Sequence, residues 1–204
     1  MRADVPDRYR DRTLDTYDGS ASPTAAKALA AARRVASGEA RSLVLVGPPG
    51  VGKTHLMAGI FRAVSDRTVA EWMEARHAAI AGFRPVPPML SPEWCSVPEL
   101  VADLRTEMGT DLHAASDRAI RLRTWPALLV LDDLGREKIS DWTGELVYTL
   151  VNARYEAMLP TIASSNLSPA ELAASGYWPV VSRLAEDGAL VEIKAPDRRI
   201  EGAR

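Results

Sequence analysis

The sequence predicts an α/β fold with a mainly parallel sheet, and three observations support this. Short, wholly apolar runs such as Ser42–Val46 and Ala127–Leu131 are typical of strands covered on both faces. Segments with helical periodicity lie between these runs, and such alternation favours a parallel sheet. A chain of 204 residues also suits one domain, which can bury roughly 70% of its unfolded surface without disulfides or metals.

The composition excludes several classes of protein. Hydrophobic residues make up 47% and charged residues 25% of the chain, which is usual for globular proteins. The formal net charge is −2, so any contact with nucleic acid must come from a local basic patch. Cys95 is the only cysteine, which excludes an internal disulfide. The sequence has no bilayer-spanning apolar run and no secretory signal, and it therefore predicts a cytoplasmic protein without membrane contact.

Start and stop signals place the first helices. Ser22 is expected to cap a helix that begins at Pro23 and ends before Gly38. A second helix is expected at His55–Val64, and Thr68-x-x-Glu71 has the form of a capping box that would start a third. Prolines between residues 85 and 92 predict an irregular linker. The other expected elements are strands at Trp94–Val97, Ala127–Leu131, Thr161–Ser164 and Ala189–Ile193, and helices at 98–108, 116–124 and 145–158.

The segment GPPGVGKT at residues 47–54 fits the phosphate-binding pattern G-x-x-x-x-G-K-[ST], and it lies between a predicted strand and a predicted helix. Successive backbone N–H groups of such a loop form an anion nest, to which the helix adds its positive end. Lys53 is expected to reach the β- and γ-phosphates, and the Thr54 hydroxyl to bind Mg²⁺. The position between strand and helix disfavours an accidental glycine-rich turn. The predicted cofactors are ATP and Mg²⁺, and the predicted binding residues are Gly47, Pro48, Pro49, Gly50, Val51, Gly52, Lys53, Thr54 and His55.

Two carboxylates, Asp132 and Asp133, follow the apolar run ALLVL. Ligands of parallel α/β sheets gather outside the carboxyl ends of the strands, where the phosphate loop also lies. We expect Asp132 to hold Mg²⁺ through its water shell and Asp133 to polarise the attacking water. The alternative is an exposed turn with solvated aspartates. Together with the phosphate loop, the pair predicts an ATPase.

The chain resembles the AAA+ ATPases of the DnaC/DnaI helicase-loader group, which also contains the IstB-type transposition helpers. The resemblance runs from Tyr9 to near Arg199 and is carried by seven ordered segments, YRDRTLDTYDG, GPPGVGKTHL, SVPELVADLR, LLVLDDLG, LVYTLVNARY, PTIASSNLSPAEL and SRLAEDG. It implies a RecA-like, three-layer P-loop core without a C-terminal lid domain. Residues 1–20 would form an N-terminal extension and residues 21–204 the ATPase domain, with an insertion at about residues 68–92.

The resemblance also implies further catalytic residues. Asn166 matches a polar sensor near the γ-phosphate, with a simple turn asparagine as the alternative. Arg183 matches the arginine finger that completes a neighbouring subunit's site, with a surface arginine as the alternative. Arg198 and Arg199 are weaker candidates for a second sensor. Asp133 stands where many AAA+ proteins carry glutamate, and its shorter side chain could slow hydrolysis.

Three segments leave alternatives open. Residues 13–17 match a segment that packs against adenine, or they form a hydrophobic staple through Leu14 and Tyr17. Residues 68–92 are either a partner surface or an insertion that buries Trp72 and Phe83. Residues 98–124 resemble an insertion that contacts single-stranded DNA, although spaced arginines are also common on helices that bind no DNA. The arginines concerned are Arg118, Arg121 and Arg123.

The main hypothesis is an ATPase that self-associates on binding ATP and helps to place a ring-shaped replicative helicase on single-stranded DNA. Only about 45 residues precede the phosphate loop, whereas helicase loaders usually carry a separate N-terminal domain that grips the helicase. A transposition helper of the IstB type would share nearly every residue named here. A third hypothesis is an adaptor that binds ATP and hydrolyses it negligibly. A small-molecule kinase is disfavoured, because the sequence shows neither an arginine-rich lid nor an acceptor pocket.

Overall fold

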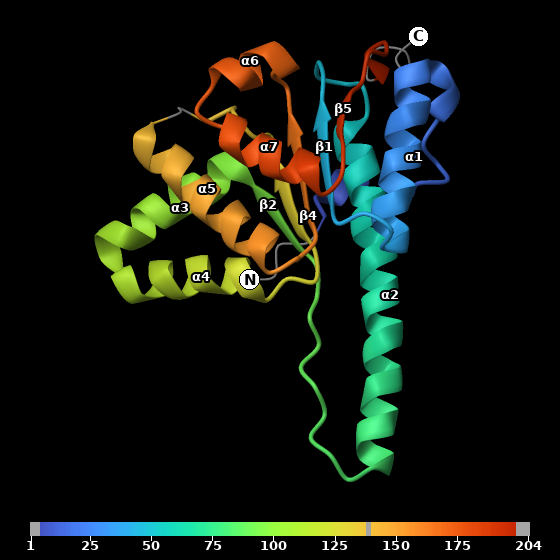
Figure 1. Cartoon of the computed structure of the whole chain (residues 1–204), viewed down its shortest axis with the longest axis vertical. Helices are drawn as coiled ribbons and strands as arrows, with labels where there is room; N and C mark the ends of the chain where they lie inside the picture. The colour runs from blue at the N-terminus through green and yellow to red at the C-terminus, as the bar shows by residue number, and fades with distance from the viewer. Residues whose placement is uncertain (1–4, 138–139, 199–204) are drawn as a thin grey trace.

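A parallel five-stranded sheet lies at the centre of the computed structural model, which describes residues 5–137 and 140–198 (Figure 1). The strand order is β2-β3-β4-β1-β5, and all neighbouring strands are parallel. The central strands β3, β4 and β1 therefore end side by side at one edge of the sheet. The strands are β1 (Ser42–Val46), β2 (Glu93–Ser96), β3 (Leu129–Asp132), β4 (Thr161–Ser165) and β5 (Leu190–Glu192).

Helices cover both faces of this sheet, which gives three layers. Side chains alternate between the faces of a strand. Leu43 and Leu45 of β1 accordingly pack into a core with α1 and α2, and Val44 and Val46 into a second core with α3, α5 and α7. The predicted α/β fold with a parallel sheet is confirmed. Within the described residues the helices are α1 (Pro23–Ser37), α2 (Lys53–Ala81), α3 (Val97–Thr110), α4 (Leu112–Thr124), α5 (Asp141–Glu156), α6 (Pro169–Ala174) and α7 (Trp178–Glu186), with short 3-10 turns η1 (Asp7–Tyr9) and η2 (Gly19–Ala21).

The first predicted helix is confirmed together with its capping. The Ser22 side chain accepts a hydrogen bond from the Ala25 N–H, and Gly38 ends the helix with φ of 86°. All five strands also lie within two residues of their predicted bounds. These elements were predictable because their signals are local in the sequence.

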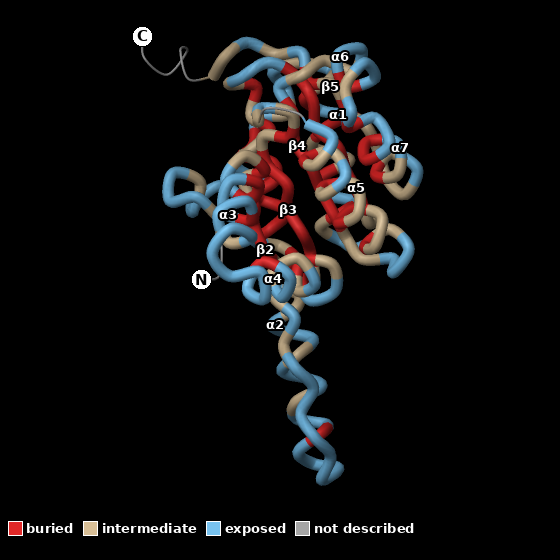
Figure 2. Tube along the Cα trace, turned by 90° about the vertical axis from the view of Figure 1, so that its left-hand side faces the viewer, coloured by how far each residue is buried: buried red, intermediate tan, exposed pale blue. Residues whose placement is uncertain are grey.

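The predicted break between His55–Val64 and Thr68 is wrong, because α2 runs unbroken for 29 residues. Thr68 lies inside this helix, where its hydroxyl donates to the Val64 carbonyl at 2.8 Å instead of capping a new helix. No proline interrupts residues 53–81, so the helix continues through the capping-box pattern. The outer half of α2 projects from the body and is largely exposed (Figure 2). The linker at residues 84–92 is irregular, as predicted.

Other helices also differ from the prediction. α4 begins at Leu112, with Asp111 as its cap, instead of at Ser116, and neither α6 nor α7 was predicted. In the N-terminal segment, Val5 and Tyr9 lie against the α1–α2 core. None of the helices formed by residues 5–137 and 140–198 combines the length and the apolar character needed to cross a membrane.

Arg154 of α5 is fully buried and connects segments distant in sequence. Its guanidinium donates to the carbonyls of Leu122, Pro126 and Pro160 and to the Thr161 hydroxyl, at 2.8–3.1 Å. These acceptors lie at the end of α4 and at the starts of β3 and β4. Burial lowers the pKa of Arg154 to about 10, so the group keeps its charge at neutral pH. Arg154 thus fixes the amino ends of the two central strands.

We expect Arg154→Met to lower the free energy of unfolding by about 3 kcal/mol or more, because it leaves buried carbonyls without donors. Urea unfolding followed by circular dichroism measures this change. Arg33→Met is the matched control, since Arg33 forms an exposed ion pair with Asp15 and should change stability by less than about 1 kcal/mol. Equal effects of the two substitutions would contradict the bracing role of Arg154.

Candidate nucleotide-binding site

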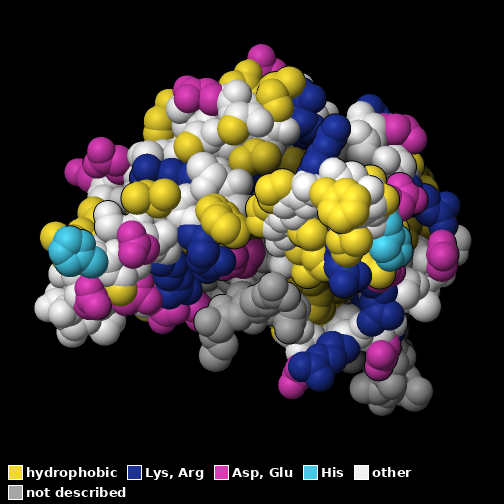
Figure 3. All heavy atoms as spheres, turned by 90° about the horizontal axis from the view of Figure 1, so that it is seen from below, with side chains coloured by type: hydrophobic (Ala, Val, Ile, Leu, Met, Phe, Trp, Pro, Cys, Tyr) yellow, Lys and Arg dark blue, Asp and Glu magenta, His cyan; other side chains and the backbone are white. Residues whose placement is uncertain are grey.

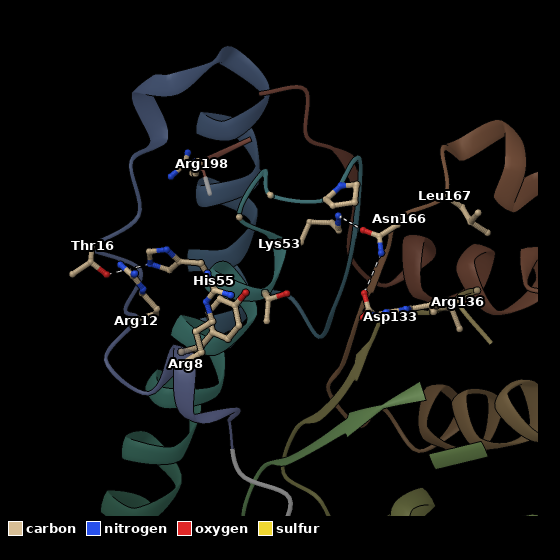
Figure 4. Close-up of a pocket in the computed structure, with 17 residues that line it drawn as sticks. Arg8, Arg12, Thr16, Lys53, His55, Asp133, Arg136, Asn166, Leu167 and Arg198 are labelled. Carbon is tan, nitrogen blue, oxygen red and sulfur yellow. Dashed lines mark hydrogen bonds and ion pairs between the residues drawn. The ribbon is translucent and has the colours of Figure 1, made fainter. Parts of the chain in front are cut away.

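A cavity of about 670 Å³ lies where β1, β3 and β4 end (Figure 4). This volume lies within the range of small-molecule sites. The phosphate-loop segment forms one wall, and the residues after β3 and β4 form the opposite wall. Residues from both ends of the chain also reach it. The lining includes Arg8, Tyr9, Arg12, Thr16, Pro49, Gly50, Gly52, Lys53, Thr54, His55, Asp133, Arg136, Asn166 and Arg198.

The phosphate-loop segment takes a conformation that needs glycine at its bends. Gly50 and Gly52 have φ of 84° and 96°, which side-chain-bearing residues rarely adopt. A Cβ at Gly52 would lie 2.8 Å from the Tyr17 ring, so this ring supports the loop from outside the cavity. Tyr17 is buried, and its hydroxyl donates to the Val51 carbonyl at 3.4 Å. Leu14 and Tyr17 line no part of the cavity, which favours packing over contact with a base; Thr16 of the same segment does line it.

Three predicted site residues meet through one side-chain amide (Figure 4). Lys53 donates from Nζ to Oδ1 of Asn166 at 2.8 Å, and Asn166 donates from Nδ2 to Oδ1 of Asp133 at 3.2 Å. Lys53 also donates to the carbonyls of Gly47 and Pro48, at 2.6 and 2.9 Å. These residues come from the loop after β1 and from the ends of β4 and β3. The structure therefore brings together the lysine, the second aspartate and the asparagine that the sequence singles out.

The two aspartates occupy different environments. Asp132 is buried and accepts a hydrogen bond from the Ser164 hydroxyl of β4, whereas Asp133 reaches the cavity. Burial raises the pKa of Asp132, and the bond from Ser164 opposes this shift. Asp133 has φ of 60°, a turn that points its carboxylate toward Asn166 and Arg136. Arg136 lies 3.1 Å from this carboxylate, and no sequence pattern had singled it out.

His55 links α2 to the N-terminal segment. Its Nε2 lies 3.0 Å from the Thr13 carbonyl and 3.1 Å from the Thr16 hydroxyl, and its ring packs edge-on against Tyr17. Burial lowers the pKa of His55; the bond to Thr13 opposes this shift, and the positive charges of Arg12 and Arg198 add to it. The neutral imidazole therefore fixes residues 13–17 beside the cavity.

Arg183 lies away from its own chain's cavity. It donates to Oδ1 of Asn152 at 2.6 Å and to the Tyr148 hydroxyl at 2.7 Å, both on α5, and its guanidinium stacks on the Tyr148 ring. These contacts hold Arg183 partly exposed on the α5–α7 surface. A role in its own cavity is excluded in this conformation, and a role in a neighbouring subunit stays a prediction.

The terminal segments add cations that the sequence reasoning missed or left weak. Arg198 lines the cavity and stacks over the Tyr17 ring at 4.3 Å, whereas Arg199 lies outside the described residues. Arg8 and Arg12 line the cavity from the N-terminal segment. The density of arginines in RYRDR, residues 8–12, was the only signal that could have indicated them.

The arginines of α4, which the sequence analysis considers for contact with single-stranded DNA, are mostly paired with carboxylates of the chain. Arg118 pairs with Asp103 and Glu107 of α3, at 3.1 and 2.9 Å. Arg121 binds both carboxylate oxygens of Glu93, one of them at 2.7 Å. These ion pairs connect α4 to α3 and β2. Two of the three arginines are therefore engaged within the chain.

The fold and the cavity define a P-loop nucleotide-binding domain. Residues 24–159 match the AAA ATPase domain, and the chain belongs to this family. The replicative helicase loader DnaI of Bacillus subtilis is 28% identical over 137 residues, which are 67% of this chain and 36% of that protein. An insertion-sequence ATP-binding protein of Mycobacterium tuberculosis is 30% identical over 161 residues, 77% of this chain and 54% of that protein. The crystal structure of the DnaC helicase loader matches with a TM-score of 0.70 and 28% identity, covering 93% of this chain and 100% of that one.

These similarities confirm the resemblance to the DnaC/DnaI group and to ATP-binding proteins of insertion sequences. The chain spans only about a third to a half of the length of these curated relatives. Membership of the AAA ATPase family implies that the chain binds a nucleotide.

The lowered pKa of His55 predicts a loss of stability in acid. An unfolded histidine has a pKa of about 6.5, so the unfolded chain binds a proton more readily as the pH falls through this value. The free energy of unfolding is then highest above the unfolded pKa and declines below it, by at most about 1.4 kcal/mol per pH unit. We expect His55→Gln to be less stable than the wild type near neutral pH but to lose less stability between about pH 7 and about pH 5. Parallel pH profiles of the two proteins in urea unfolding would contradict this.

Proposed function

We propose that the chain binds ATP with Mg²⁺, hydrolyses the ATP and thereby helps to place a ring-shaped replicative helicase on single-stranded DNA. The observation that carries the ATPase part is the Asn166 amide held between Lys53 and Asp133 at the edge of the cavity. It places a cation, a neutral hydrogen-bonding group and a carboxylate side by side. Phosphoryl transfer needs such groups to stabilise charge and to orient water.

The residues present fit ATP and Mg²⁺. The glycine bends let backbone N–H groups approach phosphate oxygens, and α2 begins at Lys53 with its positive end toward the cavity. The Thr54 hydroxyl, which lines the cavity, is a hard oxygen ligand of the kind that Mg²⁺ prefers, and the buried Asp132 carboxylate would hold the ion through its water shell. When bound, ATP with Mg²⁺ supplies a γ-phosphoryl group polarised by the ion.

Each residue would then have a separate task. Lys53 would exchange its carbonyl and amide partners for phosphate oxygens, which frees Asn166 to bind the attacking water. Asp133 would orient this water and accept its proton. Arg183 would act on the site of a neighbouring subunit, because its own cavity lies out of its reach. Self-association on binding ATP is therefore part of the proposal.

The loading part rests on similarity. The DnaC helicase loader is 28% identical to this chain over the whole of that structure. The proposal includes single-stranded DNA because the helicase is placed on it. Arg118 and Arg121 do not support a DNA contact by this chain, since both form ion pairs within it. Transposition is the second candidate function, because 30% identity links the chain to an ATP-binding protein of an insertion sequence. An adaptor with negligible hydrolysis is the third, since Arg136 pairs with the Asp133 carboxylate.

We expect Lys53→Ala and Arg183→Ala each to lower the ATPase rate by about 10³-fold, the first by removing phosphate contacts and the second by removing the finger. A mixture of equal amounts of the two variants should regain about a quarter of the wild-type rate. Half of the subunits then have an intact site, and half of their neighbours supply the finger. Phosphate release with single-stranded DNA present measures these rates.

Two outcomes would oppose this assignment. Full activity of Arg183→Ala would exclude the finger, and a mixture no faster than its separate components would exclude action between subunits. Arg33→Ala is the control, because it keeps both the nucleotide site and the finger. Its mixture with Lys53→Ala should show only the activity that the Arg33→Ala subunits already have. Tight ATP binding by the wild type without turnover would favour the adaptor.

The loading function is tested with the purified replicative helicase from the same source. We expect a stable complex in the presence of ATP, detected by size-exclusion chromatography with light scattering. Lys53→Ala should form less of it. If the helicase and the wild-type chain elute separately with and without ATP, the loader hypothesis is wrong, and the transposition helper becomes the main one.

A further inference from the structure

The outer part of α2 forms a long projection from the body of the structure (Figure 1). Val64 is the last side chain of α2 in the α1–α2 core, and the helix continues from there to Ala81. At 1.5 Å per residue, this part extends about 25 Å beyond Val64. We call residues 66–92, the outer part of α2 and the segment that returns to β2, the arm. It points away from the end of the sheet that holds the cavity (Figure 1).

The arm has a defined internal structure. Trp72 donates from Nε1 to the Pro87 carbonyl at 2.9 Å, which ties the returning segment to the helix. Nearer the end of the arm, the backbone N–H of Arg84 donates to the Ala79 carbonyl at 2.8 Å, and Ala79 is buried. The prolines of the returning segment favour an extended backbone without strand pairing. The arm is thus a helix with one covered face, and its other surfaces remain exposed.

Large apolar side chains gather at the end of the arm. Phe83 is 99% exposed, Ile80 53% and Val86 43%. Viewed from below, hydrophobic side chains cluster at this end (Figure 3). We call Ile80, Phe83, Arg84 and Val86 the arm tip. Contiguous exposed apolar side chains at the end of a projection are typical of a protein–protein contact.

The backbone holds Phe83 outward at an energetic cost. Phe83 has φ of 52°, a left-handed conformation that is unfavourable for a bulky residue. Glycine or asparagine would make this turn with less strain. Since Phe83 is 99% exposed, its ring gains no packing against residues 5–137 or 140–198 that would offset the strain. The stabilising contact is therefore expected to come from another molecule.

The charge of the arm end restricts what this molecule is. Charge is unevenly distributed along the arm. Between Ala75 and Ser91 the ionisable side chains are Arg76, His77 and Arg84, whereas the acidic residues of the arm, Asp66, Glu71 and Glu74, lie nearer the body. Two such basic outer ends would repel each other, which disfavours a second copy of the chain. Single-stranded DNA stacks its bases on aromatic side chains. The tip offers a single aromatic ring among aliphatic side chains, which disfavours DNA as the partner.

We propose that the arm tip inserts Phe83 and Ile80 into an apolar groove with an acidic rim on the replicative helicase. This inference rests on the proposed function and adds the site of the contact to it. Arg84 would face the acidic rim, so complementary charges orient the apolar insertion. Arg76 lies further back, with its guanidinium 5.8 Å from the centroid of the Trp72 ring. The tip lies at the opposite end of α2 from the cavity, so the contact leaves the nucleotide site accessible.

The test measures binding of the purified replicative helicase by biolayer interferometry with ATP present. Phe83→Asn and Ile80→Gln each remove an anchor, and each should weaken binding at least about tenfold. Asparagine tolerates the left-handed turn, so Phe83→Asn keeps the fold of the arm. Arg84→Glu should weaken binding more at low salt than at high salt. The basal ATPase rate should not change in any of these variants.

Met158→Asn is the matched control. Met158 is also an exposed apolar residue, with φ of 58° and 55% exposure, and it follows α5 outside the arm. This variant should bind the helicase as the wild type does. Circular dichroism checks that all variants are folded to the same extent.

The outcomes separate this inference from the proposed function. If the wild type binds the helicase and the tip variants bind equally well, the arm inference is wrong and the loader function stands. If the wild type does not bind the helicase, both are wrong. If Phe83→Asn instead loses affinity for a labelled oligothymidine, or changes the mass of the chain's own assembly in light scattering, the occupant is DNA or a second copy and the proposal is overturned.

Discussion

The candidate site depends on one neutral amide, that of Asn166, which separates Lys53 from Asp133. This arrangement follows from the strand order, because β4 lies between β3 and β1. Each of the three residues follows one of these strands, and parallel strands end at the same edge. A direct ion pair between Lys53 and Asp133 would hold both charges in one interaction. The amide keeps them close and lets each act on a different group.

The surroundings of this amide limit the cost of burying charge. Lys53 is only 6% exposed, yet its ammonium donates to two loop carbonyls and to Asn166. Asp132 is buried as well, and the Ser164 hydroxyl compensates part of its desolvation. Burying an ionised group is tolerated where such partners are supplied. The site is therefore held in place by polar partners from β1 and β4, with Tyr17 supporting the loop from behind.

The sequence predicted features that have local signals. A glycine-rich loop after an apolar run, and two aspartates after another, indicate the strand ends that form the site. Arg154 and the ion pairs of Arg118 and Arg121 could not be predicted in this way, because their partners lie on other elements. The capping-box pattern at Thr68 failed for a related reason. A local cap signal competes with the continuing helix, and without a proline or a stable turn the helix prevails.

The unbroken α2 has a consequence for both ends of the molecule. Lys53 is its first residue and Ala81 its last, and 29 residues correspond to about 43 Å. An α-helix without an internal proline is stiff over this length, since sharp bends require a break in its hydrogen bonds. A tilt of about 10° at the loop would move the far end by about 7 Å. Groups that bind the loop and groups that bind the arm tip therefore act on the same rigid element, which two separate helices would not provide.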